Sequence, residues 1–147
     1  MKYKFPPAGT SMDGLGAHTD KPLCVILFAD QVSGLEVQTK DGRWLNLTVS
    51  PNSFVFMVGD PLMAWSNGRL HAVRTSGDNE RYSIGTFLVP VEGTIIKPPK
   101  ELVDEEHPQI LRDFDYHEFI NFSNTKEAMA IDSAKQIIAF AAIKWNK

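Results

Sequence analysis

Short segments with strand-like patterning follow one another through residues 23–89, and this feature restricts the fold more than any other. Leu23–Ala29 is a continuous apolar run, short enough for a buried strand rather than a helix. Leu35–Thr39 and Trp44–Leu47 both alternate apolar and polar residues, and Asp41-Gly42 lies between them. Asp-Gly between two such segments predicts a hairpin, because a type I′ turn needs positive φ at both central residues.

Three further candidate strands continue this pattern. They cover Ser53–Val58, Leu70–Val73 and Tyr82–Val89, and Asn67-Gly68 marks a second turn of the hairpin kind. Strands about ten residues apart, with no helix between them, predict an all-β sandwich or jelly roll rather than a parallel sheet.

The composition becomes more polar after the last of these strands, and helices are expected there. Asp115 is placed to cap a short helix through Phe119, and Asn124 with Glu127 resembles a capping box. An apolar stripe at helical spacing follows and predicts a helix that docks on the sheet. Its members are Ile131, Ala134, Ile138 and Ala141. We therefore expect a mainly β core over residues 1–95 and a helical extension packed on it over residues 96–147.

Size and charge exclude several classes of function. A chain of 147 residues is long enough for one compact domain. Its net charge of −3 argues against nucleic acid as a partner, and no apolar run approaches the about 20 residues that span a bilayer. The single cysteine, Cys24, cannot form an internal disulfide, and the N-terminus has no signal-peptide pattern. We expect a cytoplasmic domain that acts on a small molecule, without nucleic-acid or membrane partners. No pattern reports its oligomeric state.

His18-Thr19-Asp20 places two potential metal ligands two residues apart. On an extended segment both side chains point to the same side, so an imidazole and a carboxylate can reach one metal. Taken alone, this spacing is more often found in a surface loop. A third ligand must come from elsewhere, and His71 lies on a candidate strand, although a lone strand histidine is more often a half-buried residue. Two histidines and one carboxylate leave open positions on the metal, an arrangement typical of iron(II) oxygenases.

Arg81-Tyr82-Ser83 begins the last candidate strand. An arginine can hold a distal carboxylate through two parallel hydrogen bonds, and a serine hydroxyl can complete the grip. For any single arginine, a surface position beside a hairpin is the default interpretation. His107 and His117 lie in the polar C-terminal region and are expected at the surface.

Taken together, several short motifs resemble a known family. They are Leu15–Lys21, Gly34–Val37, Asp41–Trp44, Val58–Asp60, Trp65–Leu70 and Arg81–Ser83. In this order they resemble the C-terminal catalytic part of plant 2-oxoglutarate-dependent dioxygenases. The His18–Lys21 segment, with Glu101–Asp104 and the following Glu-His-Pro, is most similar to the AOP-like branch, which is named for glucosinolate side-chain enzymes.

The resemblance implies a fold and a metal centre. The fold would be a double-stranded β-helix, which is a cupin-like jelly roll, flanked by C-terminal helices. His18, Asp20 and His71 would hold Fe(II), and no catalytic residue beyond this metal centre is implied.

The resemblance also implies a cosubstrate and a reaction. 2-Oxoglutarate would chelate the iron, with its distal carboxylate on Arg81 and Ser83 and a hydrogen bond from Tyr3. Oxygen would be the third reactant, and oxidative decarboxylation would release succinate and CO2. A small organic metabolite would be hydroxylated or desaturated.

The sequence departs from the family pattern in two places. Family members carry a long helical and strand region before the segment that begins here at Met1. They also have a few more residues between Asn67–Leu70 and Arg81, with Arg-Val after the ligand histidine. In one alignment His71 is the ligand. In the other it matches a non-ligand histidine, and the true ligand is deleted. Besides an active oxygenase, a truncated relative that binds metal without turnover and a jelly-roll binding module therefore stay open.

Overall fold

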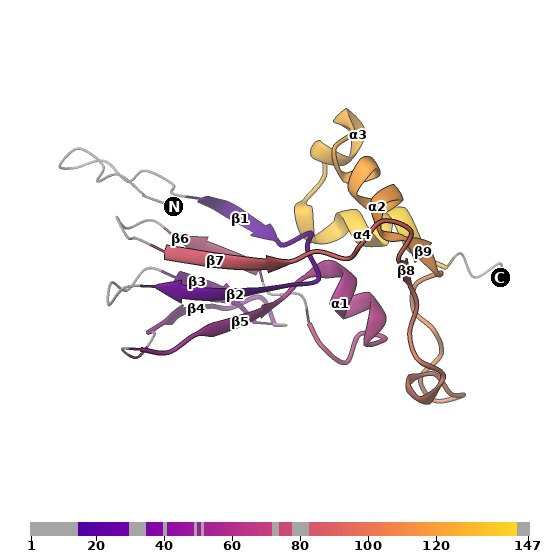
Figure 1. The fold of residues 1–147 in the computed structure, drawn as a ribbon, viewed down its shortest axis with the longest axis horizontal. Helices are drawn as coiled ribbons and strands as arrows, with labels where there is room; N and C mark the ends of the chain where they lie inside the picture. Colours follow the sequence, from indigo (N-terminus) through magenta and orange to yellow (C-terminus); the bar gives the residue numbers. More distant parts are fainter. Residues whose placement is uncertain are drawn as a thin grey trace.

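Figure 1 shows a computed structural model of the chain, with strands gathered at one end and most of the helices at the other. The structure describes residues 15–29, 35–39, 41–48, 50, 52–71, 74–77 and 83–143, and the description below concerns these residues. This part is rich in strands and carries helices toward its C-terminus, as the sequence predicts.

One sheet has four strands in the order β1-β6-β3-β4, all paired antiparallel. Because β6 lies between β1 and β3, segments far apart in the sequence are neighbours in this sheet. At the β1–β6 pairing His18 is opposite Thr75, and Thr19 is opposite Arg74. The strands are β1 (Leu15–Thr19), β3 (Leu35–Gln38), β4 (Trp44–Leu47) and β6 (Arg74–Gly77).

The second sheet has three antiparallel strands, β5 (Val55–Val58), β2 (Cys24–Ala29) and β7 (Ser83–Leu88), in that order. One face of β2 carries Val25 and Leu27, which are buried and pack with residues of β3. The other face carries Ile26 and Phe28, which are 38% and 36% exposed. The apolar run is therefore a strand as predicted, but its second face is buried only at Cys24.

The predicted hairpin forms between β3 and β4, with a loop longer than the two-residue turn expected. The Thr39 N–H donates to the Arg43 carbonyl at 2.8 Å, and the Gly42 N–H donates to the Thr39 carbonyl at 2.9 Å. Gly42 has φ +84°, a conformation that favours glycine. This bonding is that of a three-residue hairpin loop with a left-handed glycine.

The segment after β5 differs from the prediction, because it forms a helix, α1 (Asp60–Trp65), where no helix was expected between the strands. Pro61 sits in the first helical turn, where its missing N–H costs nothing. Asn67 and Gly68 have positive φ as expected for Asn-Gly, but they end a helix. The Gly68 N–H donates to the Met63 carbonyl and the Asn67 N–H to the Ala64 carbonyl, which is the Schellman pattern.

The strand predicted over Leu70–Val73 is also displaced. Leu70 and His71 lie in an irregular segment, and the next strand, β6, begins at Arg74. The physical reason is that the Leu70 N–H donates to the hydroxyl of Ser66, the cap residue of α1, and so remains part of the helix end.

The chain after β7 forms a short ribbon and then helices. β8 (Ile95–Ile96) pairs with β9 (Phe114–Asp115), and a 3-10 turn, η1 (Lys100–Leu102), lies between them. The cap predicted at Asp115 is confirmed, because its carboxylate accepts from the N–H groups of His117 and Glu118 at the start of α2 (Tyr116–Ser123). No helix in the described residues is long and apolar enough to span a bilayer.

The last predicted helix is divided in two, α3 (Lys126–Met129) and α4 (Ser133–Ala141). Thr125, and not Asn124, caps α3 by accepting the Ala128 N–H, and Asp132 caps α4. Of the predicted apolar stripe, Ala141 is fully buried as expected, but Ile138 is 48% exposed and its neighbour Ile137 is fully buried instead.

A hydrophobic core fills the helical end of the molecule. It includes Phe119 and Ile137, both with no exposed surface, and edge-to-face phenylalanine pairs surround it. Its buried members are Ala64, Ile96, Leu111, Phe114, Tyr116, Phe119, Ile137 and Ala141.

Candidate functional site

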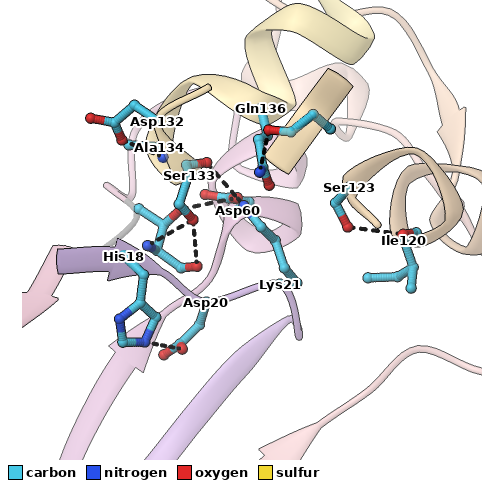
Figure 2. A network of polar contacts seen from close by, with 12 residues as sticks. His18, Asp20, Lys21, Asp60, Ile120, Ser123, Asp132, Ser133, Ala134 and Gln136 are labelled. Carbon is cyan, nitrogen blue, oxygen red and sulfur yellow. Dashed lines mark hydrogen bonds and ion pairs between the residues drawn. The ribbon is translucent and has the colours of Figure 1, made fainter. Parts of the chain in front are cut away.

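His18 and Asp20 lie together where β1 ends, as the two-residue spacing predicts. The Nε2 atom of His18 is 3.5 Å from Oδ1 of Asp20, and their side chains are 29% and 13% exposed. Figure 2 shows both side chains on the same side of the strand end, away from the helices. An imidazole nitrogen and a carboxylate oxygen that face each other in this way are suitable donors for one divalent cation that prefers mixed nitrogen and oxygen ligands.

The backbone around Asp20 is held by the start of α1. The Asp60 N–H donates to the Asp20 carbonyl at 2.9 Å, and the Gly59 N–H donates to the Leu23 carbonyl at 3.0 Å. A Cβ atom on Gly59 would lie 1.9 Å from the Pro22 carbonyl oxygen, so only glycine allows this close approach. The Val58-Gly59-Asp60 motif therefore supports the loop that carries Asp20.

A buried ion pair lies on the side of this loop opposite the His18 and Asp20 side chains. Lys21 Nζ is 2.7 Å from Asp60 Oδ2, and the Asp60 side chain is only 1% exposed. Burial raises the pKa of the Asp60 carboxyl, while the positive charge and hydrogen bond of Lys21 and the hydroxyl of Thr19 act against that rise. The negative charge of Asp60 therefore depends on its two partners.

The structure does not gather His71 with this pair into a group of three metal ligands. His71 is exposed, in the irregular segment between α1 and β6. Within the described ranges, no three side chains of His, Cys, Asp or Glu lie close enough together to hold a metal ion. The two donors at the end of β1 thus fit a metal, and the role of His71 as third ligand stays a prediction.

The predicted cosubstrate residues fall largely outside the described part of the chain. Ser83 is the first residue of β7 and is paired with Ala29. Arg81 and Tyr3 lie outside the described residues. The roles of these three residues stay predictions.

The other two histidines lie away from His18 and Asp20 in sequence. His107 is exposed as predicted, and its Nδ1 is 2.9 Å from Oδ1 of Asp104. Hydrogen bonds from His107 lower the pKa of the Asp104 carboxyl. His117 is half-buried rather than at the surface, because it lies in the first turn of α2 beside the buried ring of Tyr116.

An apolar hollow of about 600 Å³ lies between α1 and the segment β7–β8. Neither His18 nor Asp20 lines it, so it is separate from the paired donors. Its lining residues are Leu23, Leu62, Trp65, Leu88, Val89, Pro90, Thr94, Ile95 and Ile96.

Sequence reasoning missed that Lys21, Asp60 and Ser133 interact. Lys21 and Asp60 belong to two of the family-like motifs, Leu15–Lys21 and Val58–Asp60, but no sequence pattern pairs them. Ser133 hydrogen-bonds Thr19 across a sequence separation of 114 residues, and a contact at that distance leaves no local pattern. The only sequence signal for this contact is that Lys21 follows the candidate ligand Asp20 and that Asp60 follows the apolar run ending at Val58.

Comparison with known proteins gives consistent matches. The model of the family described as "2OG-Fe(II) oxygenase superfamily" matches residues 1–90. Among curated proteins, the chain is 45% identical over 151 residues to "Probable 2-oxoglutarate-dependent dioxygenase AOP1.2" of Arabidopsis thaliana. That match covers 97% of this chain and 46% of the relative, so the chain spans about half the length of this curated protein.

Two solved structures are similar along most of the chain. The rice dioxygenase for auxin oxidation is 32% identical with a TM-score of 0.84, covering 96% of this chain and 49% of that one. The Arabidopsis thaliana dioxygenase for auxin oxidation 1, solved as a binary complex with 2-oxoglutarate, is 37% identical with a TM-score of 0.66. It covers 73% of this chain and 42% of that one.

Proposed function

Because the chain belongs to the 2OG-Fe(II) oxygenase superfamily, and its curated relatives include AOP dioxygenases, we propose that it carries the metal centre of an oxygenase acting on a small organic metabolite. The reaction would be a hydroxylation or desaturation that consumes 2-oxoglutarate and O2 and releases succinate and CO2. The observation that carries this proposal is the 3.5 Å approach of His18 Nε2 to Asp20 Oδ1. When bound, iron(II) and 2-oxoglutarate supply the activation of O2 on which the oxidation depends.

His18 and Asp20 would occupy two positions on the metal. The carboxylate reduces the positive charge of the centre, and the remaining charge favours an anionic cosubstrate. Both side chains are partly exposed, at 29% and 13%, so a second molecule can reach the metal between them.

We propose His71 as the third ligand, brought to the pair when a metal binds. Its support is the pairing of β1 with β6, in which Thr19 is opposite Arg74. The segment that carries His71 leads into β6 and therefore into the strand beside the donor pair. His71 is already exposed in this segment, so that it can reach a metal without first leaving a packed core.

Arg81, Ser83 and Tyr3 are proposed to hold 2-oxoglutarate. An arginine can pair with the distal carboxylate through two hydrogen bonds, and such a pair limits the cost of desolvating that carboxylate. Ser83 would add its hydroxyl from the start of β7. We expect Arg81→Ala to weaken 2-oxoglutarate binding much more than metal binding.

The two sheets would be the two halves of a double-stranded β-helix. Their antiparallel pairing, in the orders β1-β6-β3-β4 and β5-β2-β7, supports this proposal, as does the TM-score of 0.84 to the rice dioxygenase. Residues 1–95 would form this core, and residues 96–147 would form the helical extension.

A second candidate function is metal binding without turnover, or a binding role of the jelly roll alone. One observation favours it: no group of three ligating side chains gathers among the described residues.

Anaerobic titration with Fe(II) and 2-oxoglutarate tests the proposal. We expect a visible charge-transfer band in the wild-type chain and its loss in His18→Ala, because the metal would lose one of its donors. Succinate formation in air then separates the oxygenase from a chain that only binds. Absence of the band in the wild type would overturn the proposed function, whereas a band without succinate would favour the second candidate.

A further inference from the structure

The side of the β1 end opposite the donor pair is held by a polar network. Successive side chains of an extended segment point to opposite sides, so Thr19 and Lys21 point away from His18 and Asp20. Thr19 is 4% exposed, and the Lys21 side chain is 22% exposed. Figure 2 shows the donor pair on one side of this segment and Asp60 and Ser133 on the other.

Lys21 joins two distant elements to the loop. Its Nζ donates to Asp60 Oδ2 at 2.7 Å, at the start of α1, and to the Ser133 carbonyl at 2.9 Å, at the start of α4. Its ammonium group also lies 5.6 Å from the centre of the Phe119 ring. Because a buried carboxylate without a partner is costly, Asp60 holds Lys21 in place and Lys21 stabilises Asp60.

Ser133 joins the same loop through Thr19. The Thr19 N–H donates to Ser133 Oγ at 3.2 Å, and the two hydroxyl oxygens are 3.3 Å apart. The Thr19 hydroxyl also donates to Asp60 Oδ2 at 3.2 Å. The residues on either side of Asp20 are therefore fixed by α1 and by α4, which lie far away in the sequence.

We propose that the Lys21–Asp60 ion pair and the Ser133 hydroxyl are positioning groups for the metal centre. They fix the backbone of residues 19–21 and so set the direction in which His18 and Asp20 present their donor atoms. This inference rests on the proposed function. Side chains that support metal ligands in this way typically change metal affinity by about 10–100-fold when they are removed. Metal binding near the N-terminal end of the described chain would thus depend on a helix at its C-terminal end.

The serine is tested by Mn(II) titration, in which electron paramagnetic resonance measures free and bound Mn(II). We expect Ser133→Ala to weaken Mn(II) binding by about tenfold and to broaden the spectrum of the bound ion. Ser133→Thr keeps the hydroxyl and should restore both. The matched control is Ser123→Ala. Ser123 is also a helical serine, buried where Ser133 is half-buried, but its hydroxyl donates to the Ile120 carbonyl of its own helix at 2.9 Å. Its loss should leave Mn(II) affinity unchanged.

The ion pair is tested by the double variant Lys21→Met with Asp60→Asn, which replaces two charges by neutral groups of similar size. We expect Mn(II) binding to weaken by about 10–100-fold while circular dichroism still shows a folded chain. Lys97→Met is the control, because it breaks the Lys97–Asp113 pair, whose side chains are 60% and 37% exposed. If the double variant does not fold, the Mn(II) affinities of Ser133→Ala, Ser133→Thr and Ser123→Ala decide whether the inference holds.

The outcomes distinguish this inference from the proposed function. If wild-type chain binds no Mn(II), or His18→Ala binds it equally well, the proposed function fails and the inference fails with it. If His18→Ala abolishes binding while Ser133→Ala and a folded double variant keep wild-type affinity and spectrum, the inference alone is wrong. Equal losses in Ser123→Ala and Ser133→Ala would also overturn it, because they would show a general effect of destabilisation.

Discussion

Two phenylalanines at the helical end of the molecule are buried, whereas those on the free face of the sheet β5-β2-β7 are exposed. At the helical end Phe114 and Phe119 are 3% and 0% exposed, with ring centres 5.7 Å apart. At the sheet, Phe54 and Phe56 are 69% and 56% exposed. Phe54 contacts Phe28, with ring centres 5.6 Å apart, but most of its surface remains open.

The difference teaches that residue type alone does not determine what an aromatic side chain contributes. Removing apolar surface from water stabilises a fold by roughly 25 cal/mol per Å². The buried rings around Phe119 contribute this stabilisation, and the exposed rings of the sheet contribute little of it. β1, which carries His18, belongs to the other sheet and contacts α4 at the helical end.

The largest expected effect is that of Phe119→Ala. Removing a fully buried ring leaves a cavity in the core that α2 and α4 share, and should lower the free energy of unfolding by about 3–5 kcal/mol. Phe56→Ala is the matched control, because the same substitution at a 56% exposed ring should change it by about 0.5 kcal/mol or less. Urea denaturation followed by circular dichroism measures both. Similar losses in the two variants would break the comparison.

An intermediate effect is expected for Gly59→Ala, where β5 passes into α1. The added Cβ would lie 1.9 Å from a backbone oxygen of Pro22, so the loop carrying Asp20 must shift. We expect a loss of about 1–3 kcal/mol in the free energy of unfolding. Gly85→Ala is the control, because its Cβ would meet Phe87 and Val25 at an ordinary 3.5 Å. If the Gly59→Ala chain is as stable as the Gly85→Ala chain, the close approach of Gly59 to Pro22 does not constrain this loop.

The smallest effect is expected at the surface of the helical end. The hydrogen bond from Gln109, followed by that from Lys97, lowers the pKa of the Asp113 carboxyl in the folded chain. A lowered folded pKa means that the contribution is present above the unfolded pKa and is lost as the pH falls through the folded value. Because Asp113 is 37% exposed, Asp113→Asn should cost less than about 1 kcal/mol at neutral pH.

Denaturation of Asp113→Asn and wild type along a series of pH values measures this effect. The difference between the two chains should narrow in acid, because wild-type Asp113 is then protonated as well. A difference that stays constant or grows as the pH falls would show that Asp113 acts by another route. A large difference at neutral pH would show that charge, and not only buried apolar surface, holds this end together.

The sequence by itself determined the features that depend on neighbouring residues. His18 and Asp20 share one side because side chains alternate along a strand, and Asp115 caps α2 because its carboxylate reaches the next N–H groups. The positive φ of Asn67 and Gly68 was also readable, although not the helix that they end. Local conformation follows from local chemistry, so these predictions needed no knowledge of the fold.

Only the tertiary structure decided which faces are buried and which distant groups meet. The run Leu23–Ala29 reads as apolar throughout, yet the face that packs with β3 is buried while Ile26 and Phe28 on the other face are exposed. Ile137 and Ile138 are the same residue type, but the break between α3 and α4 turns only the first into the core. The contacts of Lys21 with Asp60 and Ser133 arise in the same way, because burial and pairing depend on the element that lies opposite, which no local pattern specifies.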